Sequence, residues 1–429
     1  MHQFAEKLNG ILKDTCAYSL LSDYGKRMYV PNGIIVQSAE AKQKATQFNA
    51  TAGIAKEKGS AMYIPSMKAQ FAPSLSVGDI FPYAPMGGVA ALRKLWKEQM
   101  YKKNPSLEGK AISLPIVVSG LTNALSIVFS LFVDPSDYVI LPDMYWENYD
   151  LIIDEQRQAN KVLFPFFKKG GFNLEGLDAA LASTGDKKAV VLLNFPNNPT
   201  GYTPTWDEAS AIVELLKRYS DSGKKLTIIS DDAYFGLFFE EKVCKESLFS
   251  RLCDCSENLL AIKCDAATKE EMVWGFRIAF ITYGGKGFTE EQYDALMQKT
   301  MGVVRGSISS CSNPGQNILL NGMCDSNHQK DKETGVEKIC ARYKALKKAL
   351  EKYEGRKDLV ALPFNSGYFM TFYCACEAEK LRQLLLNKYG TGVIRFDEHH
   401  IRLAFSSVDL EKVEALIDTV YTATQELLA

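Results

Sequence analysis

The stretch AVVLLNFPNNPTGY, residues 189–202, runs from a mainly apolar segment directly into a turn rich in asparagine and proline. A continuous apolar run of this length is typical of a strand buried on both faces, as in a parallel sheet covered by helices. The prolines and Gly201 fix the turn, and Asn197 and Asn198 offer amide groups beside it. The stretch therefore predicts a central strand with polar side chains at its carboxyl end, although an ordinary Asn-Pro turn explains the asparagines equally well.

Similar apolar runs lie on both sides of this stretch, between about residues 88 and 305. They are LPIVV (114–118), YVILP (138–142), LTIIS (226–230), LLAIKC (259–264) and RIAFITY (277–283). Amphipathic stretches alternate with them, and one begins with the capping-box pattern of Thr205 and Glu208 and is expected to end near Gly223. The alternation predicts an α/β fold in which helices cover a mostly parallel sheet. Ligands of such sheets bind outside the carboxyl ends of the strands.

The length of 429 residues fits about two domains. We expect an N-terminal arm with part of the small domain at 1–80, a large domain at 81–312 and a small α+β domain at 313–429. The first segment is rich in Gly, Pro and Ser and is predicted to be irregular. The last contains long helical runs and the strand-like stretches GYFMTFYCAC and HHIRLAFSS.

The charge balance excludes several kinds of partner. The 50 Lys and Arg residues nearly cancel the 51 Asp and Glu residues, so no overall basic field draws the chain onto nucleic acid or an anionic membrane. The start MHQFAEKLNG has no apolar signal segment and no run of about 18 apolar residues occurs, so we expect a cytoplasmic protein without a membrane partner. The 10 cysteines are scattered and only 4 histidines occur, so reduced thiols and no metal site are expected.

A glycine-containing turn follows the predicted strand at 114–118. The segment SGLTNALSIVF, residues 119–129, opens a helix there. Backbone N–H groups at such a turn, with the helix dipole behind them, bind anions such as phosphate, and Thr122 adds a hydroxyl donor. A purely structural turn is the alternative. Neither GxxxxGKS/T nor GxGxxG occurs in the segment, so a nucleoside triphosphate or a dinucleotide is not expected.

The strand at 226–230 leads straight into two acids and a tyrosine, in SDDAY. Acids beside a buried strand need a partner, so Asp231 and Tyr234 belong either to a site or to a local salt bridge. Lys269 follows the next strand, and Arg277 begins the one after. Taken alone, Lys269 is most simply a surface lysine before two solvated acids, but a desolvated lysine amine attacks carbonyl groups. Because such motifs occur in order at successive strand ends, we favour the catalytic interpretation.

NNPTG, SDDAY and a lysine eight positions before the arginine of GFR together resemble the class I/II pyridoxal-phosphate-dependent aminotransferases of fold type I. The resemblance runs from about residue 49 to residue 408. It implies a large domain with a mostly parallel sheet of the seven-stranded type, a smaller α+β domain, an N-terminal arm, and pyridoxal 5′-phosphate as the cofactor.

The resemblance assigns Lys269 the Schiff base with the cofactor aldehyde and, later, the movement of the substrate proton. Asp231 matches the acid that keeps the pyridine nitrogen protonated. Tyr234 and Asn198 match the two donors to the phenolic oxygen of the ring. Trp146, in LPDMYWENY, falls at the position that stacks on the cofactor ring, where a core tryptophan is the alternative.

The phosphate-binding positions of the family correspond to Gly120, Leu121, Thr122 and Arg277. Tyr83, in FPYAPMGG, matches a tyrosine that reaches the phosphate of the neighbouring subunit. The resemblance therefore implies a homodimer with shared sites.

Three residues take substrate-binding roles by the same resemblance. Arg402, in IRLAFSS, matches the arginine that binds the substrate α-carboxylate in a bidentate way. Gly53, in FNATAG, lies in the segment that closes over the substrate, and Asn198 is also assigned to the substrate.

The chain departs from the family pattern near the phosphate. Ala266 stands where many members have a phosphate-binding serine, and Thr268 is the candidate replacement. The common GxRxG is replaced by GFRIA, residues 275–279. The phosphate site therefore lacks one side-chain donor of the family pattern, and the cofactor assignment is unchanged.

The preferred substrate side chain stays open. In some members of the family an arginine of the neighbouring subunit pairs with a dicarboxylate side chain. Arg305 matches it if Ser309 sets the register of VRGSISSCSNPGQN, but alignment on the SNP triplet puts Ile308 there, and a locally paired arginine is the alternative. Trp274 and Phe276 suit an apolar or aromatic substrate, and core packing explains them equally well.

The resemblance implies an aminotransferase that exchanges an amino group between an L-amino acid and a 2-oxo acid in a ping-pong cycle. The alternative is a pyridoxal-phosphate-dependent C–S β-lyase, because the same fold hosts lyases. A cofactor-binding regulatory module is disfavoured, since no DNA-binding segment is appended and the lysine is present.

Overall fold

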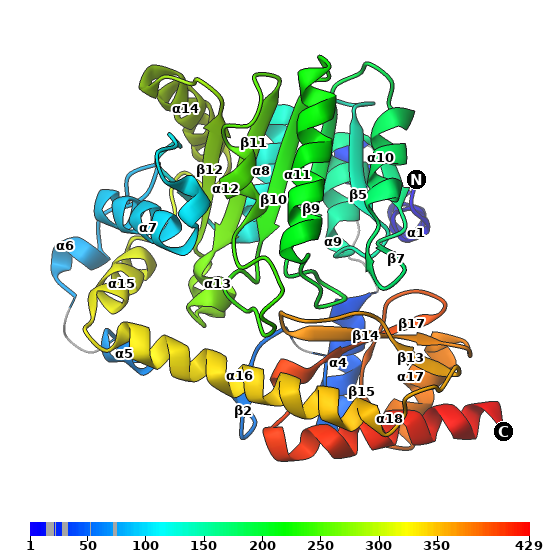
Figure 1. Ribbon diagram of the computed structural model, residues 1–429. Coiled ribbons are helices and arrows are strands. Elements are labelled where there is room, and N and C mark those ends of the chain that lie inside the picture. Colours follow the sequence, from blue (N-terminus) through cyan, green and yellow to red (C-terminus); the bar gives the residue numbers. More distant parts are fainter. Residues whose placement is uncertain (14–20, 22, 28–32, 52, 72–74) are drawn as a thin grey trace.

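The computed structural model describes residues 1–13, 21, 23–27, 33–51, 53–71 and 75–429. Figure 1 shows a large sheet flanked by helices in the upper part of the molecule and a smaller region below it. The long helix α16 (His328–Glu351) crosses the lower region, with the C-terminal helix α18 (Val413–Leu428) packed against it. Of the described helices, none is both long enough and apolar enough to cross a lipid bilayer.

The large sheet has seven strands in the order β4-β12-β11-β10-β9-β5-β6. In chain order they are β4 (Ile116–Val118), β5 (Tyr138–Pro142), β6 (Asn160–Phe164), β9 (Ala189–Asn194), β10 (Leu226–Asp232), β11 (Leu259–Ala266) and β12 (Ala279–Gly285). The strand β12 is antiparallel to both of its neighbours, whereas the other neighbouring pairs are parallel. The predicted α/β fold with a mostly parallel sheet is confirmed.

Two details of the sheet differ from the prediction. β6 lies at the edge of the sheet and is only partly buried, so its sequence NKVLF lacks the apolar run that identified the other strands. The strand predicted from Arg277 begins at Ala279 instead, because a 3₁₀ turn at Trp274–Phe276 precedes it and Arg277 has a left-handed backbone, with φ of 55°.

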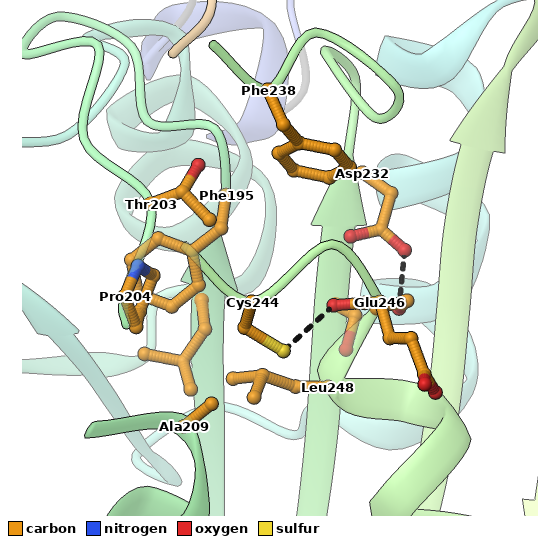
Figure 2. A pocket seen from close by; sticks show the side chains of 12 residues that line it. Phe195, Thr203, Pro204, Ala209, Asp232, Phe238, Cys244, Glu246 and Leu248 are labelled. Atoms are coloured by element: carbon orange, nitrogen blue, oxygen red, sulfur yellow. Dashed lines mark hydrogen bonds between the residues drawn. The ribbon is translucent and has the colours of Figure 1, made fainter. Parts of the chain in front are cut away.

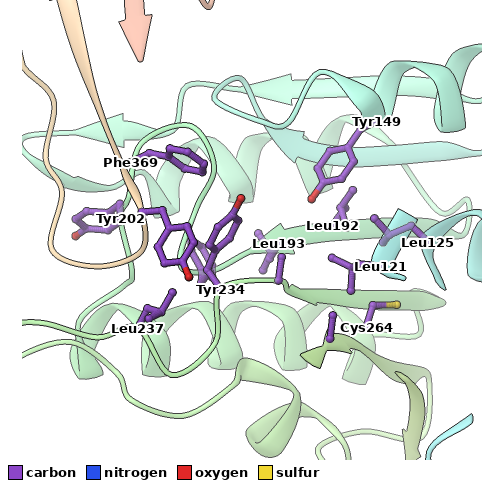
Figure 3. Packing of buried hydrophobic residues seen from close by; sticks show 14 of the residues in the cluster. Leu121, Leu125, Tyr149, Leu192, Leu193, Tyr202, Tyr234, Leu237, Cys264 and Phe369 are labelled. Carbon is purple, nitrogen blue, oxygen red and sulfur yellow. The ribbon is translucent and has the colours of Figure 1, made fainter. Parts of the chain in front are cut away.

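Helices on both faces enclose this sheet (Figure 1). They are α7 (Ala90–Lys103), α8 (Leu121–Phe132), α10 (Leu174–Ser183), α11 (Trp206–Asp221), α12 (Leu248–Leu252) and α14 (Glu290–Ser307), whereas the short α13 (Ala267–Glu270) lies at the carboxyl end of β11. The capping box predicted for α11 is confirmed, since the Thr205 hydroxyl accepts from the Glu208 N–H and the Glu208 carboxylate accepts from the Thr205 N–H. Figure 3 shows Leu192 and Leu193 of β9 with side chains of α8 in the buried cluster.

The smaller region contains a four-stranded antiparallel sheet in the order β13-β14-β17-β16. The strands are β13 (Leu359–Ala361), β14 (Phe369–Cys374), β16 (Ile394–Arg395) and β17 (His400–Ala404), and the helices are α15 (Asn313–Cys324), α16, α17 (Ala378–Asn387) and α18. The strand-like stretches GYFMTFYCAC and HHIRLAFSS thus form β14 and β17. The predicted domain boundaries at 80 and 312 stay a prediction.

The prediction that the first 80 residues are irregular is wrong for much of the described part. It contains α1 (Gln3–Leu12), α3 (Asp23–Arg27), α4 (Ile34–Lys44), α5 (Pro65–Ala69) and α6 (Val77–Ile80). On α4, the Gln37 amide donates to the Arg395 carbonyl at 3.1 Å and accepts from the Arg395 N–H at 2.6 Å. The short strand β1 (Phe48–Asn49) pairs with β15 (Thr391–Gly392). These contacts join residues 34–49 to the smaller region.

Candidate active site

A cavity of about 310 Å³ lies at the carboxyl ends of β9, β10 and β11 and extends to β17. It is lined by ten of the twelve predicted site residues: Gly53, Leu121, Thr122, Trp146, Asn198, Asp231, Tyr234, Lys269, Arg277 and Arg402. Gly120 and Tyr83 do not line the cavity, although Gly120 lies beside the lining residue Arg277. Residues from almost the whole length of the chain therefore meet at one cavity.

Asp231 is a buried acid that three donors hold in place. The Tyr149 hydroxyl donates to Oδ2 at 2.5 Å, and the Ala233 N–H and the Asn194 amide donate to Oδ1 at 3.1 and 3.3 Å. Burial raises the pKa of Asp231 to about 6, against the lowering effect of the Tyr149 hydrogen bond. The carboxylate is thus ionised at neutral pH and oriented in the cavity wall.

Tyr149 and Asn194 were not among the predicted site residues. Both lie in quoted segments, because Tyr149 ends LPDMYWENY and Asn194 ends the strand β9. The contact between Tyr149 and Asp231 spans 82 positions of sequence, so no local pattern reveals it. The usable signal was only that Asn194 is a polar residue at the end of a strand and that Tyr149 lies soon after one.

The neighbouring acid, Asp232, takes the structural role that was the alternative for this motif. It forms an ion pair with the fully buried Lys263, and the Ser247 hydroxyl donates to its Oδ2 at 2.6 Å. Figure 2 shows Asp232 facing a small cavity of about 10 Å³, among mainly apolar side chains and the Cys244 thiol. Asp232 therefore pairs with buried groups next to the sheet, whereas Asp231 faces the larger cavity.

Lys269 is carried by the short helix α13, which follows β11 directly. Its ammonium nitrogen lies 4.5 Å from the centre of the Tyr234 ring, and no hydrogen bond or ion pair to it occurs among the described residues. Burial lowers the pKa of Lys269 to about 8, while the charge of Asp231 opposes this shift and the charge of Arg277 adds to it. An appreciable fraction of the amine is therefore neutral near physiological pH, as a nucleophilic lysine requires.

The two acids after Lys269 are buried, so the expectation that they are solvated is wrong. Glu270 accepts from Lys103 at 2.6 Å and from Lys332 at 2.7 Å. Glu271 accepts from Lys332 at 2.8 Å and contacts His328 at 2.7 Å. Helices α7 and α16 are thereby fixed to the turn that carries the candidate catalytic lysine.

The predicted glycine-containing turn is present at the start of α8, and anion binding by it stays a prediction. Gly120, at the N-cap, has φ of 82°, and a Cβ placed on it would lie 2.2 Å from Nη2 of Arg277. Only glycine lets the guanidinium lie so close to this backbone. The first N–H groups of α8, at Leu121 and Thr122, have no partner within the helix, so they and Arg277 form a cradle for an anion.

The residues that depart from the family pattern have clear positions. Ala266 is buried at the end of β11 and offers no side-chain donor. Thr268, the candidate replacement for the missing serine, is among the residues that line the cavity. Arg305 lies outside the cavity, and its Nη1 donates to the Ser309 hydroxyl at 2.6 Å, which is the local pairing named as its alternative.

Arg402 is a buried cation on β17 without a carboxylate partner among the described residues. Nη1 donates to Asn198 Oδ1 at 2.8 Å and Nη2 donates to the Thr51 carbonyl at 3.1 Å, and the guanidinium lies 4.2 Å from the centre of the Phe369 ring. Its Nε has no partner in the described part of the chain. Burial lowers the pKa of Arg402 to about 10. A buried, incompletely satisfied guanidinium is suited to binding a carboxylate.

The remaining predicted residues border the same space. A Cβ on Gly53 would lie 3.6 Å from the Phe369 ring and 3.9 Å from the Tyr234 hydroxyl. Trp146 packs edge-on against Tyr149 with ring centres 5.7 Å apart and also lines the cavity. Within the described residues, no cluster of three metal-ligating side chains is found, and nine cysteines are free thiols.

The comparisons with known proteins agree with this geometry. The profile of the family described as "Aminotransferase class I and II" matches residues 46–420. The chain belongs to this aminotransferase family. The cofactor of the family, pyridoxal 5′-phosphate, fits the residues present: the cradle at Gly120 suits its phosphate, the buried Asp231 suits a protonated ring nitrogen, and the Lys269 amine suits its aldehyde.

Curated relatives match parts of the chain. A probable aspartate/prephenate aminotransferase of Aquifex aeolicus is 27% identical over 264 residues, which cover 60% of this chain and 63% of that protein. An aspartate aminotransferase of Bacillus subtilis is 28% identical over 198 residues, which cover 46% of this chain and 47% of that protein. The matched part thus spans about half to two thirds of these relatives.

Solved structures match over nearly the whole chain. An aminotransferase from Anaerococcus prevotii has a TM-score of 0.84 at 22% identity and covers 94% of this chain and 99% of its own. The kynurenine aminotransferase of Pyrococcus horikoshii, solved in complex with PMP, has a TM-score of 0.80 at 17% identity and covers 98% of this chain and 100% of its own. At these identities the likeness shows the fold, which is fold type I.

Proposed function

We propose that this chain is a pyridoxal-phosphate-dependent aminotransferase that moves the amino group of an L-amino acid to a 2-oxo acid. The observation that carries the proposal is that the half-buried Lys269 amine, with its lowered pKa, shares one cavity with the buried and incompletely paired Arg402. One group is suited to moving a proton at a substrate carbon, and the other to holding the carboxylate of the same molecule.

Each site residue has a role in this proposal. Bound pyridoxal phosphate supplies an electron sink for the substrate α-carbon. Asp231 keeps the ring nitrogen protonated, and Tyr234 and Asn198 donate to the ring oxygen. Lys269 anchors the cofactor and then takes the α-proton of the substrate and delivers it again, as general base and general acid. Gly120, Leu121, Thr122 and Arg277 would hold the phosphate, and Trp146 would cover the ring.

A half-reaction tests the proposal. The protein loaded with pyridoxal phosphate is mixed with one amino acid and no oxo acid, and the absorbance of the cofactor is followed while the 2-oxo acid is measured. We expect one equivalent of oxo acid for each equivalent of pyridoxamine phosphate. Formation of pyruvate and ammonia from cysteine conjugates, without pyridoxamine phosphate from any amino acid, would instead establish the β-lyase alternative.

Replacing Arg402 by alanine should raise the KM for every amino acid roughly 10- to 100-fold, because a charge-assisted pair to the carboxylate contributes about 1.5–3 kcal/mol. The absorbance of the bound cofactor should not change. Arg402→Lys, which keeps the charge but loses the fork, should give an intermediate KM. Loss of the cofactor from Arg402→Ala would show that Arg402 is misassigned.

We also propose that the active protein is a homodimer in which Tyr83 binds the phosphate of the partner subunit. Tyr83 is 92% exposed, and Val77 and Phe81 beside it are 74% and 77% exposed. Exposed apolar side chains grouped in this way are typical of a contact surface. Light scattering should give about twice the chain mass of 47.8 kDa. A monomer that still turns over amino acids would contradict the shared site.

A further inference from the structure

A second cavity, of about 410 Å³, adjoins the candidate active site. It lies between residues 54–71 and the turn at 272–276, and it shares Ile54 and Trp274 with the cavity that contains Lys269. We refer to it as the side cavity. Its walls are mainly Met62, Ile64, Met67, Met272, Val273 and Phe276.

The walls of the side cavity are anchored at both sides. The N–H of Ser66 on α5 donates to Asp331 of α16 at 2.8 Å, which fixes the helix that carries the buried Met67. The opposite wall follows Lys269 directly, through the 3₁₀ turn at Trp274–Phe276. At the rim, Phe71 contacts Phe276 edge to face with ring centres 5.7 Å apart. The 3₁₀ turn at Trp274–Phe276 thus contributes to the walls of both the side cavity and the candidate active site.

The lining of the side cavity is almost uncharged. Among the described residues that line it, Lys68 alone is charged. The Lys68 ammonium group lies 5.0 Å from the centre of the Tyr63 ring, which is itself more than half exposed. Trp274, at the junction of the two cavities, has a buried Nε1 without a partner among the described residues. An apolar group entering the side cavity gains about 25 cal/mol for each Å² removed from water. A carboxylate that entered would lose its hydration without a buried cation to replace it.

We propose that the side cavity receives the side chain of the amino-acid substrate, and that the enzyme prefers large apolar or aromatic amino acids to alanine and to dicarboxylates. This inference rests on the proposed function and names its substrate class. With the α-carboxylate on Arg402 and the α-carbon beside Lys269, a large side chain extends past Ile54 and Trp274.

The test compares kcat/KM for L-phenylalanine, L-methionine, L-alanine and L-aspartate with the cofactor-loaded protein. We expect phenylalanine and methionine to exceed alanine and aspartate by roughly 30- to 100-fold, as a filled apolar pocket allows. Equal values, or a preference for aspartate, would overturn the substrate class while leaving the aminotransferase proposal in place. Failure to convert any amino acid would overturn both.

A variant tests whether the side cavity causes the preference for large apolar amino acids. Ala61 is an exposed residue that lines the side cavity and not the site, so Ala61→Trp fills the space from its rim. We expect kcat/KM for phenylalanine to fall at least about tenfold and that for alanine to change less than about twofold. Ala69→Trp, on the same segment but outside both cavities, is the matched control and should change neither value. If Ala61→Trp lowers both values equally, or only alters the oligomeric mass, the side cavity does not take the substrate side chain.

Discussion

Lys269→Ala is expected to abolish transamination, with a loss of at least about 10⁴-fold, because the substitution removes both the anchor of the cofactor and the proton carrier. The visible absorbance of lysine-bound cofactor should disappear as well. Lys286→Ala, at an exposed lysine outside the cavity, should leave both properties unchanged. Retention of the absorbance band by Lys269→Ala would mean that another lysine holds the cofactor.

The lowered pKa of Lys269 adds a pH test of the same assignment. Only the neutral amine attacks an aldehyde, so the rate at which the apoprotein takes up pyridoxal phosphate should rise with pH and level off above about 8, the pKa to which burial lowers this lysine. Stopped-flow absorbance measures this rate, with Lys269→Ala as the background. A rate that continues to rise through the ordinary lysine pKa of 10.5 would show that the amine is not desolvated.

Local patterns were sufficient for six of the seven strands, and they placed many of the predicted site residues near strand ends that meet at one cavity. Strands buried on both faces give continuous apolar runs, and the site residues follow such runs at strand ends, so LTIIS predicted both a strand and the position of Asp231. The edge strand β6 lacks such a run. The helices before residue 49 were missed because their partners, such as Arg395 for Gln37, lie 358 positions away.

Long-range charge pairing explains the main error near Lys269. Acids are solvated in most positions, and no local pattern identified a buried partner for Glu270 or Glu271. Their partners lie 167 positions before, in Lys103, and 62 and 61 positions after, in Lys332. These acids are buried because α7, α13 and α16 pack together, and this packing joins segments that are far apart in the sequence.

Lys332→Met should be the most destabilising of the charge substitutions in this cluster. It removes the cation shared by two buried carboxylates, and breaking a buried pair in this way costs about 3–5 kcal/mol. We expect the low end, about 3 kcal/mol of unfolding free energy, because Lys103 and His328 still contact Glu270 and Glu271. Lys332→Arg should restore most of the loss, and Lys330→Met, at an exposed lysine of the same helix, should change the stability by less than about 0.5 kcal/mol.

The pH dependence of stability separates the charge effect from a packing effect. Burial raises the pKa of Glu270, but the charges of Lys103 and Lys332 outweigh burial and lower the pKa to about 2, from 4.5 in the unfolded chain. The contribution of this carboxylate is therefore fully present above pH 4.5 and is lost as the pH falls toward 2. The stability difference between the wild type and Lys332→Met, measured by denaturant unfolding, should shrink over that interval. A difference that stays constant there would mean that Lys332 stabilises the turn behind Lys269 by packing and not by charge.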